Sequence, residues 1–121
     1  MPHRYRRADR VDALLKQEIA RVMREEVKDP RVGFATVMDV ASSPDLRHAR
    51  IYVSVMGTET EKEETLSALR SASGFVRARV GEEITLKHLP ELHFELDRSL
   101  EKAARIDAIL GGRRTPDPSE E

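Results

Sequence analysis

The chain has 121 residues, the length of a single domain, and 39% of them are hydrophobic, which is ordinary for a globular protein. It has no cysteine, which excludes disulfides, thiolate catalysis and cysteine-ligated zinc. No apolar run reaches the roughly 20 residues of a membrane helix, and the polar residues 1–10 do not resemble a signal peptide. We therefore expect a cytoplasmic protein with no membrane partner.

The net charge of −1 hides an uneven distribution of charged residues. Residues 1–50 hold 11 Lys and Arg against 8 Asp and Glu, whereas residues 51–97 hold 5 against 9. Of the 21 basic residues 16 are arginines, whose planar guanidinium suits phosphate and base edges. Either the N-terminal half meets a nucleic-acid backbone, or the arginine content only reflects a GC-rich genome.

The first predicted helix runs from residue 9 or 10 to about residue 28. Asp29-Pro30 and then Gly33 end it, because the residue before a proline disfavours helical geometry. Spacings of three and four predict one apolar stripe that faces a core. The stripe consists of Val11, Leu14, Leu15, Ile19, Val22 and Met23.

The opposite face of this helix carries a predicted basic ridge. The ridge consists of Arg10, Gln17, Arg21, Arg24 and Lys28, which share one side at 100° per residue. The basic tail at residues 1–8 adds Arg4, Arg6 and Arg7. A basic helix face is often simply solvated, but its alignment with a basic tail favours contact with RNA.

A β-hairpin follows, with strands at residues 34–41 and 47–56 joined by a Ser-Ser-Pro-Asp turn. Along the second strand, Ala49, Ile51, Val53 and Val55 alternate with His48, Arg50, Tyr52 and Ser54. The polar face, with Arg47 and Arg50, is either an RNA-facing surface or the solvated side of an antiparallel sheet. We favour the solvated side.

A second helical pattern opens at Thr60, which forms a candidate capping box with Glu63, and ends at Gly81. Gly74 lies within it, where glycine costs about 1 kcal/mol relative to alanine. It therefore predicts a kink or the close approach of another backbone. Arg70 and Arg77 flank this position and are candidate phosphate contacts on either side of a bend.

A third strand at residues 92–97 and a last helix from Ser99 complete the domain. The last helix is expected to bury Leu100, Ala103, Ile106 and Leu110, and all three phenylalanines are expected in the core. Residues 113–121 have no apolar side chain and predict a disordered tail. The expected organisation is a basic tail at 1–8, a domain at 9–112 and a disordered tail at 113–121.

Catalytic motifs are absent: the sequence has no phosphate-binding glycine loop and no zincin motif. The histidines at positions 3, 48, 88 and 93 show no ligand spacing along the chain. The best enzyme hypothesis is a nuclease-like metal site formed by Asp39, Asp45, Glu95 and Asp97. Acids at strand ends also cap loops, so we expect no enzyme, no cofactor, no metal and no small-molecule substrate.

The order helix, strand, strand, kinked helix, strand, helix resembles the type II KH arrangement, an α+β domain with a three-stranded sheet backed by helices. The Gly-x-x-Gly loop that clamps phosphates in such domains is missing. In its place, Ala72-Ser73-Gly74 resembles the Ala-x-Gly kink of the ribosome-binding factor A family. Further segments resemble that family in order and spacing: Asp29-Pro30-Arg31-Val32-Gly33, Ser43-Pro44-Asp45-Leu46-Arg47-His48-Ala49, Leu89-Pro90-Glu91-Leu92-His93-Phe94 and Asp97-Arg98-Ser99.

The resemblance covers about residues 6–110 and implies a ribosome assembly factor. Such a factor binds the free 30S ribosomal subunit, assists late maturation and 5′-end processing of 16S rRNA, and is linked to growth in the cold. We expect a monomer. Ala103-Ala104 departs from the family, which often has a glycine there. The residues alone indicate a basic-faced domain that associates with RNA, and a stationary-phase factor or a ribosomal-protein-like module is the alternative.

Overall fold

A computed structural model describes residues 7–110, with side-chain surroundings for all of these except 7, 8, 33 and 100–104. The predicted C-terminal tail and residues 1–6 of the predicted basic tail lie outside the described residues. The elements in order are α1 (Arg7–Glu25), the 3-10 helix η1 (Pro30–Phe34), β1 (Ala35–Ser42), β2 (His48–Val55), α2 (Glu59–Glu83), β3 (Glu91–Leu96) and α3 (Ser99–Leu110). This order confirms the predicted α+β class with one three-stranded sheet. Within residues 7–110, no helix is long and apolar enough to span a membrane.

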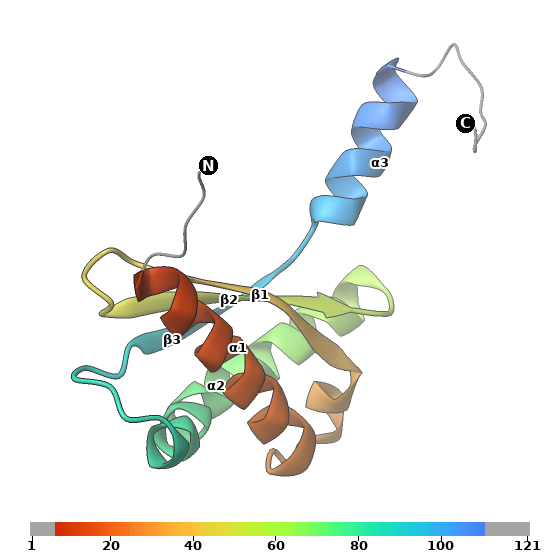
Figure 1. The fold of residues 1–121 in the computed structure, drawn as a ribbon. Coiled ribbons are helices and arrows are strands. Elements are labelled where there is room, and N and C mark those ends of the chain that lie inside the picture. Colours follow the sequence, from red (N-terminus) through yellow and green to blue (C-terminus); the bar gives the residue numbers. More distant parts are fainter. Residues whose placement is uncertain (1–6, 111–121) are drawn as a thin grey trace.

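The sheet has the order β1-β2-β3, with β1 antiparallel and β3 parallel to the central strand β2. A parallel pair needs a long crossover connection, and α2 provides it. Figure 1 shows α1 and α2 side by side beneath one face of the sheet, while no element within residues 7–110 covers the other face and α3 points away from the domain. The fold is therefore two layers, with one layer of helices and one of strands.

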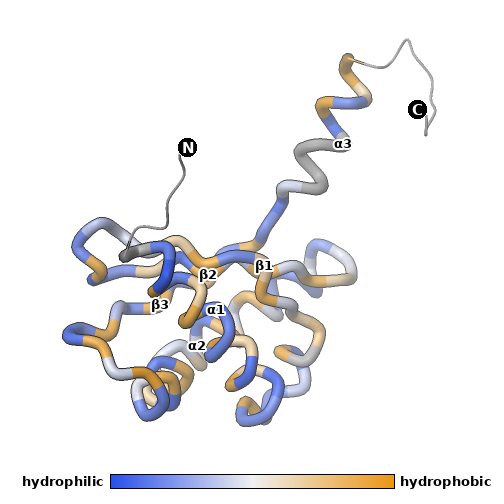
Figure 2. The backbone as a smooth tube through the Cα atoms, viewed as in Figure 1, coloured by the Kyte–Doolittle hydropathy of each residue, from blue (hydrophilic) through white to orange (hydrophobic). Residues whose placement is uncertain are grey.

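The core lies between the sheet and the two long helices. The predicted alternation along β2 is confirmed, because its inward residues from Ala49 to Val55 are buried. Figure 2 shows hydrophobic and hydrophilic positions alternating along the elements that enclose this layer. The largest fully buried side chains include Leu15, Ile19 and Val22 of α1, Ile51 and Val53 of β2, Leu69, Val76 and Val80 of α2, and Phe94 of β3.

Several predicted core residues are exposed instead. Phe34 is 67% exposed because it ends η1 and does not begin β1, so it does not follow the strand alternation. Leu14 and Phe75 lie one helical position away from the buried residues Leu15 and Val76, which turns them about 100° from the core. The prediction that all three phenylalanines are buried is therefore correct only for Phe94.

The predicted burial of α3 is also wrong for the residues whose side chains are described. Ile106 is exposed and Leu110 is 65% exposed, because the helix extends away from the sheet. Figure 2 shows hydrophobic positions at the far end of α3, distant from the core. The side chains of Leu100 and Ala103 lie outside the described set.

The capping box of α2 lies two residues earlier than predicted. Thr58 Oγ1 accepts a hydrogen bond from the Glu61 amide at 3.1 Å, and Glu61 Oε1 accepts one from the Thr58 amide at 2.7 Å. Both Thr58 and Thr60 precede a glutamate at the same spacing. Gly57, with φ of 129°, turns the chain immediately before Thr58 and so selects the first pair. The helix then continues past Gly81 to Glu83.

The predicted kink at Ala72-Ser73-Gly74 does not break α2, which is one helix from Glu59 to Glu83. Gly74 does not have a positive φ, and a Cβ built on it would meet no atom within 4 Å. Neither a strained backbone nor a close approach within the described structure explains this glycine. Ser73 Oγ donates to the carbonyl of Arg70 at 2.9 Å, so its hydroxyl is satisfied within the helix.

An ionic cluster joins the end of α1 to α2. The Glu26 carboxylate accepts hydrogen bonds from Arg21 Nη1 at 2.9 Å and from Arg79 Nε of α2. Arg21 Nε also donates to Glu18 at 3.1 Å. The two guanidinium groups lower the pKa of the Glu26 carboxyl below its ordinary value, because they stabilise its ionised form.

Replacing Gly74 with alanine should stabilise the protein by roughly 0.4–1 kcal/mol, because alanine restricts the unfolded chain and fits a helical φ. Gly57→Ala is the contrasting variant. It should destabilise the protein by roughly 1–3 kcal/mol, because it strains a positive φ and drives a Cβ to 2.5 Å from the capping oxygen of Glu61. Urea unfolding measures both changes. A destabilised Gly74→Ala protein would show that the glycine meets a structural demand.

Replacing Glu26 with glutamine should lower the melting temperature at pH 7. Because the folded-state pKa of Glu26 lies below the unfolded value near 4.5, its contribution is complete above that value and is lost as pH falls further. The melting temperatures of wild type and variant should therefore converge as the pH falls below about 4.5. Glu25→Gln is the control, since Glu25 is more exposed and only Glu26 bridges the two helices. A difference in melting temperature between wild type and Glu26→Gln that stays constant with pH would contradict this role.

Candidate nucleic-acid interface

Three segments far apart in the sequence meet at one end of the domain. Figure 1 shows the start of α1, the β1–β2 turn and the α2–β3 loop at this end. The Ser42 amide, at the end of β1, donates to Asp12 Oδ1 of α1 at 3.1 Å. Because β2 and β3 are parallel, they also both begin here, at His48 and Glu91.

A hollow of about 390 Å³ lies between the turn and the loop, and its lining is mainly basic. We call its residues the basic hollow: Arg47, His48, Arg77, Lys87, His88, Leu89 and Glu91. Three permanent cations and two histidines thus face one carboxylate. Such a concave set of donors favours an anion, and guanidinium groups are suited to phosphate. Sequence reasoning missed Lys87 and His88, which stand in a loop with no periodic pattern.

Arg77 and Arg70 do not face each other across a bend. Arg77 donates through Nε to the Pro90 carbonyl at 3.0 Å and through Nη2 to the Leu89 carbonyl at 2.6 Å. Arg70 Nε donates to the carbonyl of Phe94 at 3.2 Å. These bonds satisfy backbone oxygens outside α2: the bonds of Arg77 fix the α2–β3 loop to α2, and the bond of Arg70 fixes β3 to it. Both arginines therefore have an architectural role, and Arg77 also lines the basic hollow.

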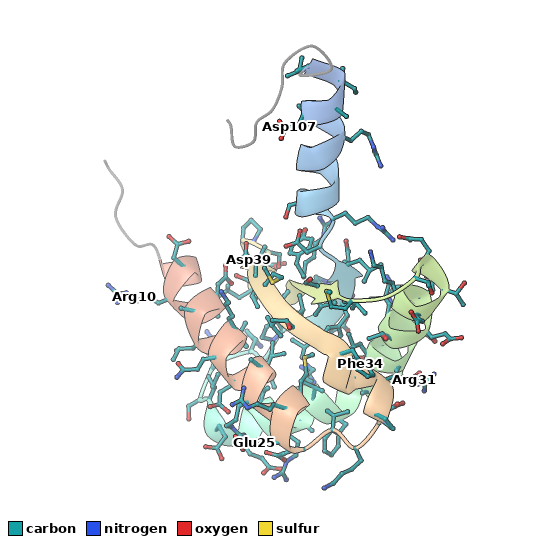
Figure 3. All side chains as sticks on the ribbon, turned by 90° about the vertical axis from the view of Figure 1, so that its right-hand side faces the viewer. Arg10, Glu25, Arg31, Phe34, Asp39 and Asp107 are labelled. Carbon is teal, nitrogen blue, oxygen red and sulfur yellow. The ribbon has the colours of Figure 1, made fainter. Side chains whose placement is uncertain are left out.

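The predicted basic ridge of α1 is divided by the structure. Figure 3 shows Arg10 projecting outward from the first turns of the helix, with Glu25 at its opposite end. Arg21, in the middle, is engaged by Glu18 and Glu26 and is only 28% exposed, so it offers little to a ligand.

The far part of the ridge forms a separate surface. Arg24 and Lys28 are exposed, and they line a second hollow of about 480 Å³ with Met23, Val27 and Val32. Lys28 lies beyond the end of α1. Of the tail residues, Arg7 begins α1, while Arg4 and Arg6 lie outside the described residues.

The outer face of the sheet carries the remaining predicted contacts. Arg47 is exposed, with its Nε 4.0 Å from Asp45. Arg50 is exposed between the buried residues Ala49 and Ile51 of β2, and its Nε lies 3.8 Å from Glu95. Both alternatives for this face, contact with RNA and solvation alone, require the exposure that Arg50 shows. Arg47, in the turn before β2, belongs to the basic hollow, whereas Arg50 does not.

Acidic residues gather at the opposite end of the domain. Glu59, Glu61, Glu63 and Glu64 occupy the start of α2, where they suit the positive end of the helix dipole. Glu59 is paired with Arg98 Nη2 at 2.9 Å. The basic hollow and the acidic start of α2 therefore lie at opposite ends of the domain.

The four acids of the nuclease hypothesis do not form a ligand cluster. Among the residues whose side chains are described, one group of three potential metal ligands lies close together, and it contains none of them. That group is His48, Glu91 and His93. The histidines show no ligand spacing along the chain, yet the fold brings His48 and His93 close enough to share an ion.

Comparison with known proteins gives a consistent result. A sequence profile described as ribosome-binding factor A matches residues 7–110. A ribosome-binding factor A of Desulfitobacterium hafniense is 43% identical over 115 residues, covering 95% of this chain and 92% of the relative. One from Halothermothrix orenii is 48% identical over 104 residues, covering 86% of this chain and 85% of the relative.

Solved structures show the same likeness. The crystal structure of ribosome-binding factor A from Thermus thermophilus has a TM-score of 0.68 and 28% identity, over 76% of this chain and 98% of that protein. A Thermus thermophilus homology model, fitted into a cryo-electron-microscopy map of a complex with 30S, has a TM-score of 0.60 and 30% identity, over 72% and 91% of the two chains. With its α+β architecture, its basic hollow and these relatives, the chain belongs to the ribosome-binding factor A family.

Proposed function

We propose that this protein binds the free 30S ribosomal subunit and assists late maturation and 5′-end processing of its 16S rRNA. The basic hollow between the β1–β2 turn and the α2–β3 loop carries the proposal. Family membership supports it, as does the relative fitted into a map of a complex with 30S.

Recognition in this proposal uses RNA shape and phosphate positions. The chain has no Gly-x-x-Gly loop to present backbone amides to phosphates, so side chains must supply the donors. Arg47 and Lys87 are exposed and available for this purpose, while Arg77 is partly committed to the loop backbone. The acidic start of α2 lies at the opposite end from the basic hollow, which favours one orientation, with the hollow towards RNA and the start of α2 away from it.

The protein acts by binding in this proposal and performs no chemistry. It works in the cytoplasm, where subunits mature, and as a monomer. The family is linked to growth in the cold, and a factor that stabilises a folded rRNA intermediate suits that condition, because misfolded RNA rearranges slowly at low temperature.

The proposed function predicts that the protein co-sediments with free 30S subunits in a sucrose gradient, and is absent from polysomes. Cells that lack it should accumulate 16S rRNA with an unprocessed 5′ end, detected by primer extension. Association with polysomes would instead indicate a stationary-phase factor or a ribosomal-protein-like module.

Replacing Arg47 and Lys87 with glutamine should weaken binding to the 30S subunit. Each lost phosphate contact should reduce the slope of log K against log salt by about one, so the double variant should lose about two. Filter binding at several salt concentrations measures both quantities. The matched control replaces Arg31 and Arg105 with glutamine, because both are exposed and lie outside the basic hollow.

Equal loss of affinity in these two double variants would mean that net charge alone determines binding, and would contradict a localised interface. A third double variant, in which Arg24 and Lys28 become glutamine, measures the far end of α1. An effect there, with no effect at Arg47 and Lys87, would move the interface to the second hollow.

A further inference from the structure

The parallel pairing of β2 and β3 brings three potential metal ligands together on the uncovered face of the sheet. His48 lies directly beside Glu91, and Arg50 lies beside His93. Residues two apart on a strand point to the same face, so His48, Glu91 and His93 project together at the start of both strands. The histidine rings lie with centroids 5.2 Å apart.

The ligand atoms form a small triangle. His48 Nδ1 is 3.0 Å from His93 Nε2, and Glu91 Oε1 is 3.6 Å from the first nitrogen and 3.7 Å from the second. A triangle with sides of 3.0, 3.6 and 3.7 Å has a point about 2.0 Å from all three corners. Bonds from Zn²⁺ to imidazole nitrogen and carboxylate oxygen are roughly 2.0–2.2 Å long. The three atoms are thus spaced as ligands of one ion.

We propose that His48, Glu91 and His93 form a site for a divalent transition-metal ion, with Zn²⁺ as the ion that fits the ligands best. Imidazole and carboxylate together suit zinc, and two histidines with one glutamate are an established three-residue ligand set. Water occupies the fourth position, since all three residues are exposed. The site does not depend on the proposed ribosomal function.

The nitrogen pair at 3.0 Å is a hydrogen bond when no ion is bound, which requires one shared proton. Zn²⁺ needs a lone pair from each nitrogen, so the histidine that carries this proton must bind the ion as its other tautomer, with the proton on its other ring nitrogen. The alternative is that the cluster is only a hydrogen-bonded histidine pair beside a surface acid. Only the metal site predicts that removing the imidazole ring of either His48 or His93 weakens metal binding.

The bound ion would join β2 to β3 where both strands begin. Within the described residues, these strands are held here by the pairing of His48 with Glu91 and by the hydrogen bond from the Glu91 amide to the Arg47 carbonyl at 2.9 Å. A metal that binds the folded state and not the unfolded chain raises the melting temperature. Stability therefore reports binding independently of calorimetry.

Isothermal titration of the untagged full-length protein with ZnCl₂ should show one site of micromolar affinity. His48→Asn and His93→Asn should each weaken it at least tenfold, and Glu91→Gln should weaken it less. His88→Asn is the matched control, because His88 is exposed in the adjacent loop and lies outside the ligand triangle. His3→Asn controls for the histidine near the N-terminus. Circular dichroism checks that the variants fold.

Zn²⁺ in hundredfold excess over the wild-type Kd should raise the melting temperature of the wild type and of His88→Asn by at least about 5 °C, and should raise that of His48→Asn by about half as much or less, because its affinity is at least tenfold lower. Wild-type protein that binds no Zn²⁺ at 1 mM would overturn the proposal. So would equal affinity and equal melting shifts in wild type, His48→Asn and His93→Asn. Wild-type protein that binds Zn²⁺ normally but does not bind the 30S subunit would count against the proposed function only.

Discussion

The parallel pairing of β3 with β2 is the constraint on which the rest of the structure depends. It requires α2 to carry the chain back along the whole sheet, so that both strands begin at the same end. The β1–β2 turn and the α2–β3 loop therefore meet, although about 40 residues of chain separate them. The basic hollow and the cluster of His48, Glu91 and His93 both follow from this meeting. An antiparallel β3 would put its first residues, and the loop before it, at the acidic end.

The arginines divide between maintaining this architecture and facing solvent. Arg70 and Arg77 hold the β3 segment through backbone carbonyls, while Arg21 and Arg79 share Glu26 between α1 and α2. A guanidinium can do this because its several donors lie in one rigid plane. Counting arginines therefore overestimates the surface available to RNA. Among the exposed cations, the fold brings Arg47 and Lys87 together in the basic hollow, which is how a protein of net charge −1 presents a basic surface.

Periodic patterns predicted the elements and which strand faces are buried, because burial on one side leaves a repeat of two or 3.6 residues. They could not place features that depend on register or on contacts between elements. The sequence contains two overlapping Thr-x-x-Glu pairs, and either could cap α2. The turn at Gly57, immediately before Thr58, places the first pair at the start of the helix. The apolar residues of α3 suggested burial, yet the helix leaves the domain and Ile106 and Leu110 are exposed. His48 and His93 are 45 positions apart, and only the register of β2 and β3 brings their rings together.

The two sites share residues, and this makes them interdependent. His48 and Glu91 belong both to the basic hollow and to the ligand triangle. Glu91 is the one carboxylate lining the hollow, so it is also the residue that most opposes a phosphate there. A divalent ion held by Glu91 would offset that negative charge and add positive charge beside Arg47. Phosphate and metal would then favour each other's binding, and linkage requires each to raise the other's affinity by the same factor. The geometry of one strand pair would thereby couple an ion-binding site to an RNA-binding surface.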